Sequence, residues 1–237
     1  MIEIKNLTKK FKKNFAVKDL SLKIEKGEVF GFLGPNGAGK TTTLKMILNL
    51  MRPDKGEIKI FNKPHHDYLI KKQIGFLPEH TYFYKYLTGN EFLHLMGELF
   101  EIPKDKREKK IKQLLKKVGL SEKDSKKPIK SYSKGMQQRI GLAQALINDP
   151  EIIFLDEPMS GLDPVGRREV KDIILDLKKK GKTVFFNSHI LSDAEILCDR
   201  VGIINQGSLI LCNSVEKITK KGKISLEDVF VKNIIKK

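Results

Sequence analysis

The chain has 237 residues, of which 40% are hydrophobic and 32% are charged, a balance that allows a packed core and excludes a disordered chain. No segment approaches the roughly 20 consecutive apolar residues that cross a bilayer, and the N-terminus lacks the layout of a signal peptide, so we expect a cytoplasmic protein. The formal net charge is +17, but the lysines are spread along the chain without forming one stripe, which favours solvated surfaces over a nucleic-acid interface.

Strand patterns and one glycine-rich turn occupy the first 80 residues. Apolar residues alternate in residues 2–4 and 20–24, which predicts strands there. The apolar run Val29–Leu33 has the composition of a buried strand, and it leads through the glycine-rich turn into a helical segment at 40–50. Further short strands are expected at residues 56–60 and 74–77.

A helical segment interrupts this pattern, and an α/β pattern then returns. Apolar residues recur at helical spacing among many lysines from about residue 88 to 128, which predicts an inserted helical subdomain. After it we expect a helix at 140–147, a strand at 152–155, a helix at 165–180, and strands at 183–186, 200–204 and 208–211. The predicted division is therefore a core of residues 1–87 and 132–211, a helical subdomain of 88–131 and a C-terminal extension of 212–237.

The glycine-rich turn matches a phosphate-binding loop. Residues 34–41 read Gly-Pro-Asn-Gly-Ala-Gly-Lys-Thr and satisfy G-x-x-x-x-G-K-[ST]. Such glycines let backbone N–H groups converge on phosphate oxygens at a helix start, while Lys40 reaches the β- and γ-phosphates and Thr41 coordinates Mg²⁺. A merely flexible turn is the alternative, but the strand before and the helix after favour a P-loop NTPase. The expected nucleotide contacts in this loop are Gly34, Asn36, Gly37, Ala38, Gly39, Lys40, Thr41 and Thr42.

A second candidate feature is the apolar strand at 152–155, which ends in Asp156 and Glu157. Because the strand is apolar on both faces, we expect it inside a parallel sheet, next to the strand that precedes the phosphate loop. Asp156 would then hold the Mg²⁺ shell, and Glu157 would act as general base toward the attacking water. An ordinary strand ending in a solvated acidic turn remains the alternative.

The segment 131–139, Ser-Tyr-Ser-Lys-Gly-Met-Gln-Gln-Arg, resembles the signature of the ATP-binding-cassette (ABC) ATPases. Ser133, Gly135 and Gln137 fall on the Leu-Ser-Gly-Gly-Gln pattern, whereas Tyr132 replaces the leading Leu. Ser133 would cap a helix start. In the family, the hydroxyl of this serine and the N–H of this glycine face the phosphate of an ATP held by the other subunit. Read without the family, the segment is an N-capped helix.

The resemblance covers nearly all of residues 1–211 and implies further site residues. Phe11 stands where the family places an aromatic that stacks on adenine, although a core aromatic on a strand is the alternative. Asp163 falls in the loop that crosses the family's dimer interface, and His189 matches the switch histidine that contacts the γ-phosphate. Glu79 departs from the usual Gln, but its carboxylate can still ligate Mg²⁺ or position water.

The resemblance also implies the fold, the cofactors and the partners. The expected fold is α/β, a P-loop NTPase of the ABC type with a mostly parallel core sheet, an antiparallel β subdomain and an inserted helical subdomain. ATP and Mg²⁺ are the implied cofactors, and a second copy of the chain would complete an ATP-sandwich dimer. The implied activity is ATP hydrolysis that drives a separate transmembrane permease from the inner face of the membrane.

The permease contact is expected near residues 79–86, where four aromatic residues gather. Residues 77–79, the signature segment and residues 226–230 look like the type-two exporter branch, which favours export. We expect no nucleic-acid partner. Soluble ABC ATPases that act on the ribosome or on DNA, or that serve iron–sulfur cluster assembly, remain the alternatives.

Overall fold

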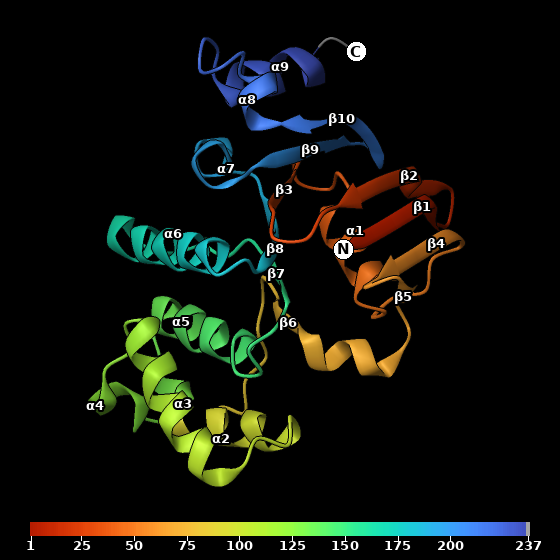
Figure 1. The fold of residues 1–237 in the computed structure, drawn as a ribbon. Coiled ribbons are helices and arrows are strands. Elements are labelled where there is room, and N and C mark those ends of the chain that lie inside the picture. Colours follow the sequence, from red (N-terminus) through yellow and green to blue (C-terminus); the bar gives the residue numbers. More distant parts are fainter. Residues whose placement is uncertain (236–237) are drawn as a thin grey trace.

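Two β-sheets with helices around them make up the computed structural model, which describes residues 1–235 (Figure 1). The strands are β1 (Ile2–Phe11), β2 (Asn14–Ile24), β3 (Val29–Leu33), β4 (Lys55–Ile60), β5 (Lys63–Pro64), β6 (Ile74–Leu77), β7 (Ile152–Asp156), β8 (Thr183–Ser188), β9 (Arg200–Asn205) and β10 (Ser208–Ser214). The helices are α1 (Lys40–Ile47), the 3₁₀ helix η1 (Tyr68–Gln73), α2 (Gly89–Leu99), α3 (Lys104–Lys117), α4 (Glu122–Ser125), the 3₁₀ helix η2 (Ile129–Ser131), α5 (Lys134–Ala145), α6 (Pro164–Lys179), α7 (Leu191–Leu197), α8 (Val215–Ile218) and α9 (Leu226–Ile235).

The larger sheet has the strand order β10-β9-β3-β8-β7-β6. Its pairs from β9 to β6 are parallel, and only the edge strand β10 runs antiparallel to its neighbour. The smaller sheet, β2-β1-β4-β5, is antiparallel. The expectation of a mostly parallel core sheet accompanied by an antiparallel β unit is therefore confirmed.

One expectation about this sheet is wrong. We expected the acidic strand beside the phosphate-loop strand, but β8 lies between β3 and β7 and pairs in parallel with both. Apolarity on both faces places a strand in the interior of a parallel sheet without specifying its neighbours. Since all three strands are parallel, their carboxyl ends still meet at one edge of the sheet.

The central strands are buried on both faces, and alternate residues serve two different cores. Phe30, Phe154 and Phe185 point into a core shared with α1 and the antiparallel sheet. Val29 and Ile153 point into the other core, which α5, α6 and α7 cover together with the helices α2 and α3. Figure 1 shows this layering, with α5 and α6 on one side of the sheet and the antiparallel sheet on the other.

Two helix ends differ from the sequence expectation by three residues or more. Helix α1 ends at Ile47 instead of residue 50, because Asn49 adopts a left-handed conformation with a φ of 56° and Leu50 N–H turns back to the Lys45 carbonyl. Helix α5 begins at Lys134, earlier than the expected residue 140, because the Ser133 hydroxyl accepts a hydrogen bond from Met136 N–H at 3.2 Å. The capping role predicted for Ser133 is confirmed.

Helices α2, α3 and α4 lie within the range for which helices were expected, at the lower end of the molecule in Figure 1. The boundaries at residues 87, 131 and 211 stay a prediction, and residues 236 and 237 of the predicted extension lie outside the described residues. Within the described chain, we find no helix with both the length and the apolar character that crossing a membrane requires.

The aromatic centre of the first core generates a stability prediction. The Phe185 ring lies 5.7–5.8 Å, centroid to centroid, from the rings of Phe30, Phe32 and Phe154. Replacing Phe185 with Ala leaves a cavity among rings that cannot collapse, so we expect the free energy of unfolding in urea to fall by about 3–5 kcal/mol. Exposed Phe15→Ala is the control and should cost about 0.5 kcal/mol. Equal losses in the two variants would contradict this description of the core.

Candidate nucleotide-binding site

The phosphate loop joins the end of β3 to the start of α1, as the sequence predicts. Gly39 has a φ of 108°, and a Cβ there would lie 2.2 Å from the Ala16 carbonyl oxygen. Only glycine fits this position. The structure describes all of α1, and no side chain caps its N-terminus. Its first backbone N–H groups and the positive end of its dipole are therefore available to an anion.

Lys40, the first residue of α1, is buried beside this loop with 7% of its surface exposed. Its Nζ donates to the carbonyl oxygens of Gly34 at 2.7 Å and Pro35 at 3.3 Å, and it lies 3.9 Å from Glu157 Oε1. Burial lowers the pKa of Lys40, against the opposing effect of nearby carboxylates, chiefly Glu157. Because the Lys40 ammonium is largely shielded from water, its charge would interact strongly with a phosphate that approaches the loop.

Asp156 ends β7 and is almost completely buried, with 2% exposure. The Thr41 hydroxyl donates to its Oδ1 at 3.5 Å. Burial raises the pKa of Asp156, and the negative charge of Glu79 adds to the rise, whereas hydrogen bonds from Asn187 and Thr41 oppose it. The structure thus brings together two of the predicted Mg²⁺ ligands, Thr41 and Asp156. A nearby cation would stabilise the ionised form of this buried carboxylate.

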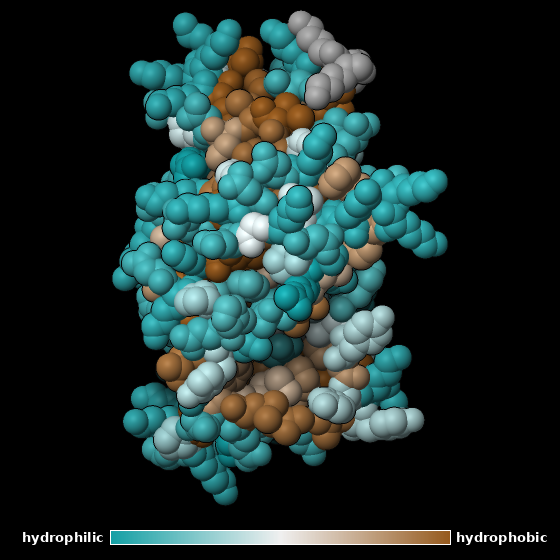
Figure 2. Space-filling view, turned by 90° about the vertical axis from the view of Figure 1, so that its right-hand side faces the viewer, coloured by the Kyte–Doolittle hydropathy of each residue, from teal (hydrophilic) through white to brown (hydrophobic). Residues whose placement is uncertain are grey.

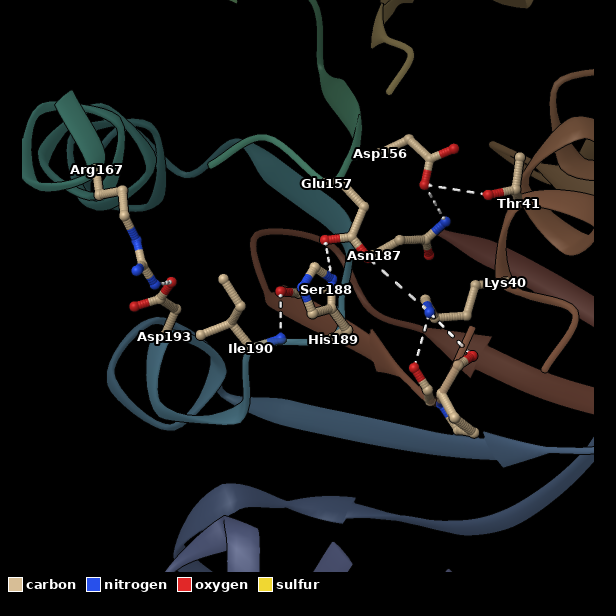
Figure 3. A network of polar contacts seen from close by, with 12 residues as sticks. Lys40, Thr41, Asp156, Glu157, Arg167, Asn187, Ser188, His189, Ile190 and Asp193 are labelled. Carbon is tan, nitrogen blue, oxygen red and sulfur yellow. Dashed lines mark hydrogen bonds and ion pairs between the residues drawn. The ribbon is translucent and has the colours of Figure 1, made fainter. Parts of the chain in front are cut away.

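Glu157 follows directly and occupies a sharp turn. Its φ is 52°, a left-handed conformation that is uncommon outside glycine, and its N–H donates to the Asn187 carbonyl oxygen at 3.1 Å. The residue is 7% exposed, and its Oε2 lies 2.9 Å from His189 Nδ1. This turn directs Glu157 toward Lys40 and His189, whereas Asp156 faces Thr41 (Figure 3).

A cavity of about 390 Å³ joins these groups. It brings together the loop residues Asn36 to Thr42 with Glu79, Glu157 and His189, which come from four separate parts of the chain. Its wall combines main-chain amides, one lysine and two carboxylates, the set that a phosphate chain with a divalent cation requires. The lining residues are Ala16, Asn36, Gly37, Ala38, Gly39, Lys40, Thr41, Thr42, Glu79, Glu157 and His189.

Phe11 is not among the residues that line this cavity. It is the last residue of β1, and 47% of its surface is exposed. The Lys9 ammonium lies 5.7 Å from the centroid of the Phe11 ring. The alternative of a core aromatic is wrong, because a core ring would be buried. Adenine stacking by Phe11 stays a prediction.

The predicted in-trans residues form a separate cluster. Ser133, Gly135 and Asp163 line another cavity, of about 430 Å³, which shares no residue with the phosphate cavity. The Asp163 carboxylate caps α6 by accepting from Gly166 N–H at 2.7 Å. Gln137 instead turns inward, and its Nε2 donates to the Tyr132 carbonyl oxygen at 3.2 Å. Within one chain, these residues and the phosphate loop belong to different sites.

Asn187 is a site residue that the sequence reasoning missed. It lies opposite Asp156 in the parallel pair of β7 and β8 and is fully buried. Its Nδ2 donates to Asp156 Oδ1 at 3.0 Å, while its Oδ1 has no hydrogen-bond partner among the described residues. Figure 3 shows the amide directed at the carboxylate that also faces Thr41. The sequence could not reveal this contact because it depends on β8 lying beside β7.

The residues present fit a magnesium ion bound together with a nucleotide. Asp156 and the Thr41 hydroxyl offer hard oxygen donors, and Glu79 lies in the same cavity as Thr41. Among residues 1–235, no cluster of three or more His, Cys, Asp or Glu side chains could hold a metal ion by itself. Mg²⁺ usually binds through one or two carboxylates plus phosphate oxygens, a donor set that Asp156 and a bound nucleotide would supply together.

A groove of about 660 Å³ adjoins the site. Glu79 lines both the groove and the phosphate cavity. Apolar groups of Leu50, Phe76 and Phe100 contribute to the groove, and Tyr82 at its edge is 96% exposed. Figure 2 shows apolar and weakly polar side chains around a hollow at the level of η1 and α2. The groove and the phosphate cavity therefore share the Glu79 side chain as part of their walls.

Comparison with known proteins decides the family. The family model described as ABC transporter matches residues 17–160, more than half of the chain. The chain belongs to the ABC transporter family. An uncharacterized ABC transporter ATP-binding protein of Nostoc sp. is 54% identical over 204 residues, which cover 86% of this chain and 61% of the relative. This chain thus spans about three fifths of that relative's length. A fluoroquinolones export ATP-binding protein of Mycobacterium tuberculosis is 40% identical over 90% of this chain and 71% of its own length.

Solved structures of ABC proteins share the fold. The structure of an ATP-binding subunit of an ABC transporter superposes with a TM-score of 0.88 at 28% identity, covering 98% of both chains. A dimeric ATP-binding cassette in a post-hydrolysis state, bound to ADP and Pi, gives a TM-score of 0.84 at 29% identity and covers 91% of this chain and 99% of its own. The fold expected from the family resemblance is confirmed.

The buried carboxylate of this ABC protein leads to a prediction about pH and stability. Burial raises the pKa of Asp156 in the folded state above its ordinary value of 3.8, so ionising this carboxylate destabilises the fold. This loss of stability develops as the pH rises from 3.8 through the raised pKa of the folded state. We expect Asp156→Asn, which removes the charge and keeps the shape, to raise the urea midpoint at pH 7 without nucleotide. The gain should shrink as the pH falls toward 4. A lower midpoint at pH 7, with the fold intact by circular dichroism, would contradict the burial argument.

Proposed function

We propose that this chain is the ATP-hydrolysing subunit of an ABC transporter. The observation that carries the proposal is the convergence of Lys40, Glu157 and the N-terminus of α1 on one cavity, with Asp156 and Thr41 beside it. The loop amides and Lys40 bind the phosphates, and Glu157 is the base that faces them. The matches to ABC ATP-binding proteins support the same activity.

Hydrolysis follows from these positions. Glu157 accepts a proton from a water molecule as the water oxygen attacks the γ-phosphorus and the bond from that phosphorus to the β–γ bridging oxygen breaks. His189, 2.9 Å from Glu157, orients the carboxylate and reaches the γ-phosphate side of the cavity. Lys40 neutralises charge on the phosphate oxygens. Thr41 and Asp156 would hold a bound Mg²⁺ ion, with Glu79 as a third candidate ligand, and the ion would neutralise further charge on the phosphates.

We also propose that two copies of the chain act together. The cavity of Ser133, Gly135 and Asp163 has no nucleotide-binding loop of its own. Facing the phosphate loop of a second copy would give each ATP a hydroxyl and a backbone N–H from the other side. The dimeric ATP-binding cassette bound to ADP and Pi supports this arrangement. ATP then becomes part of the interface, and its hydrolysis reopens the dimer.

A transmembrane permease is the proposed partner, bound at the groove beside Glu79. Tyr82, Tyr84 and Tyr86 are 65–96% exposed, and exposed aromatics are favoured anchors at interfaces. Phe83 does not serve this surface, because its ring packs edge-on against Phe92 inside the helical unit at 5.3 Å. With a membrane partner, the chain would lie peripherally on the cytoplasmic face. Export is the proposed direction, supported by relatives whose names refer to fluoroquinolones export and linearmycin resistance.

The proposed base gives the most direct mutational test of hydrolysis. Glu157→Gln keeps the size and the hydrogen-bonding capacity of the side chain but removes its basicity. We expect ATP hydrolysis to fall by about 10²–10⁴-fold, while ATP still binds in a fluorescence titration. Lys40→Ala is the companion variant and should lose binding itself. Undiminished turnover in Glu157→Gln would remove this residue from the role of base.

The proposed permease contact is tested at the groove. Tyr82→Ala removes an exposed ring without disturbing the phosphate cavity, which Tyr82 does not line. We expect the ATPase rate of the isolated chain to stay within about twofold of the native rate, while the chain recovered with its permease after co-expression falls by about tenfold or more. Val165→Ala on α6, another exposed apolar residue, is the control. Equal recovery of both variants with the permease would contradict this contact.

A further inference from the structure

The structure gathers lysines that lie far apart in the sequence into one cleft. The cleft has a volume of about 580 Å³ and lies between α3 and the C-terminal end of α6. Lysines from two segments, α3 and residues 180–182, line it: Lys106, Lys109, Lys110, Lys117, Lys180 and Lys182. We expected the basic residues to be scattered over solvated surfaces. The lysines are not scattered here, because the helical unit packs its most basic helix against the end of another lysine-rich helix, although Lys106, Lys109 and Lys180 are exposed as expected.

The carboxylates around the cleft neutralise only part of this charge. Lys117 and Lys180 share Asp176, at 2.6 and 3.1 Å. Lys182 bridges Asp149 and Glu151, at 3.4 and 3.1 Å. Three carboxylates therefore face six ammonium groups, and the surplus positive charge belongs to the other three α3 lysines of the cleft.

Those three lysines, Lys106, Lys109 and Lys110, form no ion pair with any residue in 1–235. Lys110 is half-buried, and burial lowers its pKa, with Asp149 opposing the shift and Lys182 adding to it. A partly desolvated ammonium group beside a like charge is stabilised when an anion enters. The floor of the cleft is apolar, formed by the buried side chains of Leu114, Leu146 and Leu177. The cleft therefore suits an anion that also carries apolar atoms.

The position of the cleft separates it from the nucleotide site. Lys182 immediately precedes β8, and Pro150 lies just before β7, so the cleft lies at the amino ends of strands whose carboxyl ends carry Asp156 and Asn187. It is instead a neighbour of the groove beside Glu79. The turn at 144–150 supplies Gln144, Ala145 and Asn148 to the groove and Leu146, Asp149 and Pro150 to the cleft.

We propose that this lysine cleft binds the phosphate group of an amphiphilic anion, a function separate from ATP hydrolysis. Two sources share this chemistry: the headgroup of an anionic phospholipid, and a soluble phosphate compound. A bound headgroup would hold the chain against the bilayer at a surface that adjoins the groove. A soluble ligand would instead contact residues 144–150, the segment that lines both the cleft and the groove. The inference does not depend on the proposed function, because no residue of the phosphate cavity lines the cleft.

The test compares two triple variants of the full-length chain. The cleft variant carries Lys106→Gln, Lys109→Gln and Lys110→Gln. The control carries Lys26→Gln, Lys55→Gln and Lys59→Gln, which removes the same charge from exposed lysines of the first 60 residues. The first probe is co-sedimentation with phosphatidylglycerol–phosphatidylcholine vesicles and with pure phosphatidylcholine vesicles. The second is calorimetric titration with tripolyphosphate in saturating ADP, which keeps the nucleotide site occupied.

We expect the native chain and the control to bind the anionic vesicles about tenfold or more tightly than the cleft variant does, with no binding to phosphatidylcholine alone. The same ranking with tripolyphosphate only would support the cleft and identify a soluble ligand as its source. Equal weakening in both triple variants would reduce the effect to net charge and overturn the proposal, as would the absence of binding to both probes. ATPase activity within about twofold of native in both variants would establish that both are folded.

Discussion

Buried charge at one edge of the sheet is the constraint on which the rest of the site depends. Lys40, Asp156 and Glu157 are each less than a tenth exposed, and burying such groups is costly unless each finds a partner. Their partners are loop carbonyls, the Thr41 hydroxyl, the Asn187 amide and His189. The raised pKa of Asp156 and the lowered pKa of Lys40 indicate that this compensation is incomplete. A triphosphate with a divalent cation would complete it, because it brings both signs of charge.

The parallel topology makes this arrangement possible. Strands β3, β7 and β8 run in one direction, so the phosphate loop, the acidic pair and the segment from Asn187 to His189 all emerge at the same edge. Local strain then refines the geometry: the left-handed turn at Glu157 separates the directions of two adjacent carboxylates. Asp156 faces Thr41, whereas Glu157 faces Lys40 and His189, so the two carboxylates could hold a cation and activate a water molecule separately, as proposed.

The sequence predicted those parts whose chemistry is local. The phosphate loop, the capping serine at 133 and most strand positions follow from spacing and composition, because each depends on residues adjacent in the chain. Strand order is not local, so the place of β8 between β3 and β7 and the contact of Asn187 with Asp156 could not be predicted. The lysine cleft could not be predicted for the same reason, since α3 and the end of α6 come together only in the folded chain. The roles of Phe11, Ser133 and Asp163 stay predictions that depend on a nucleotide or a second copy.

On the proposed function, main-chain amides and Lys40 recognise a chain of phosphates and not merely a nucleoside. The most direct measurement is calorimetric titration of the purified native chain with ATP, ADP, AMP and adenosine in the presence of Mg²⁺. If Lys40 and the loop bind the β- and γ-phosphates as proposed, affinity should fall by about tenfold or more from ADP to AMP, a loss of about 1.4 kcal/mol or more. Equal affinity for ATP and adenosine, or no binding of ATP at all, would contradict the account.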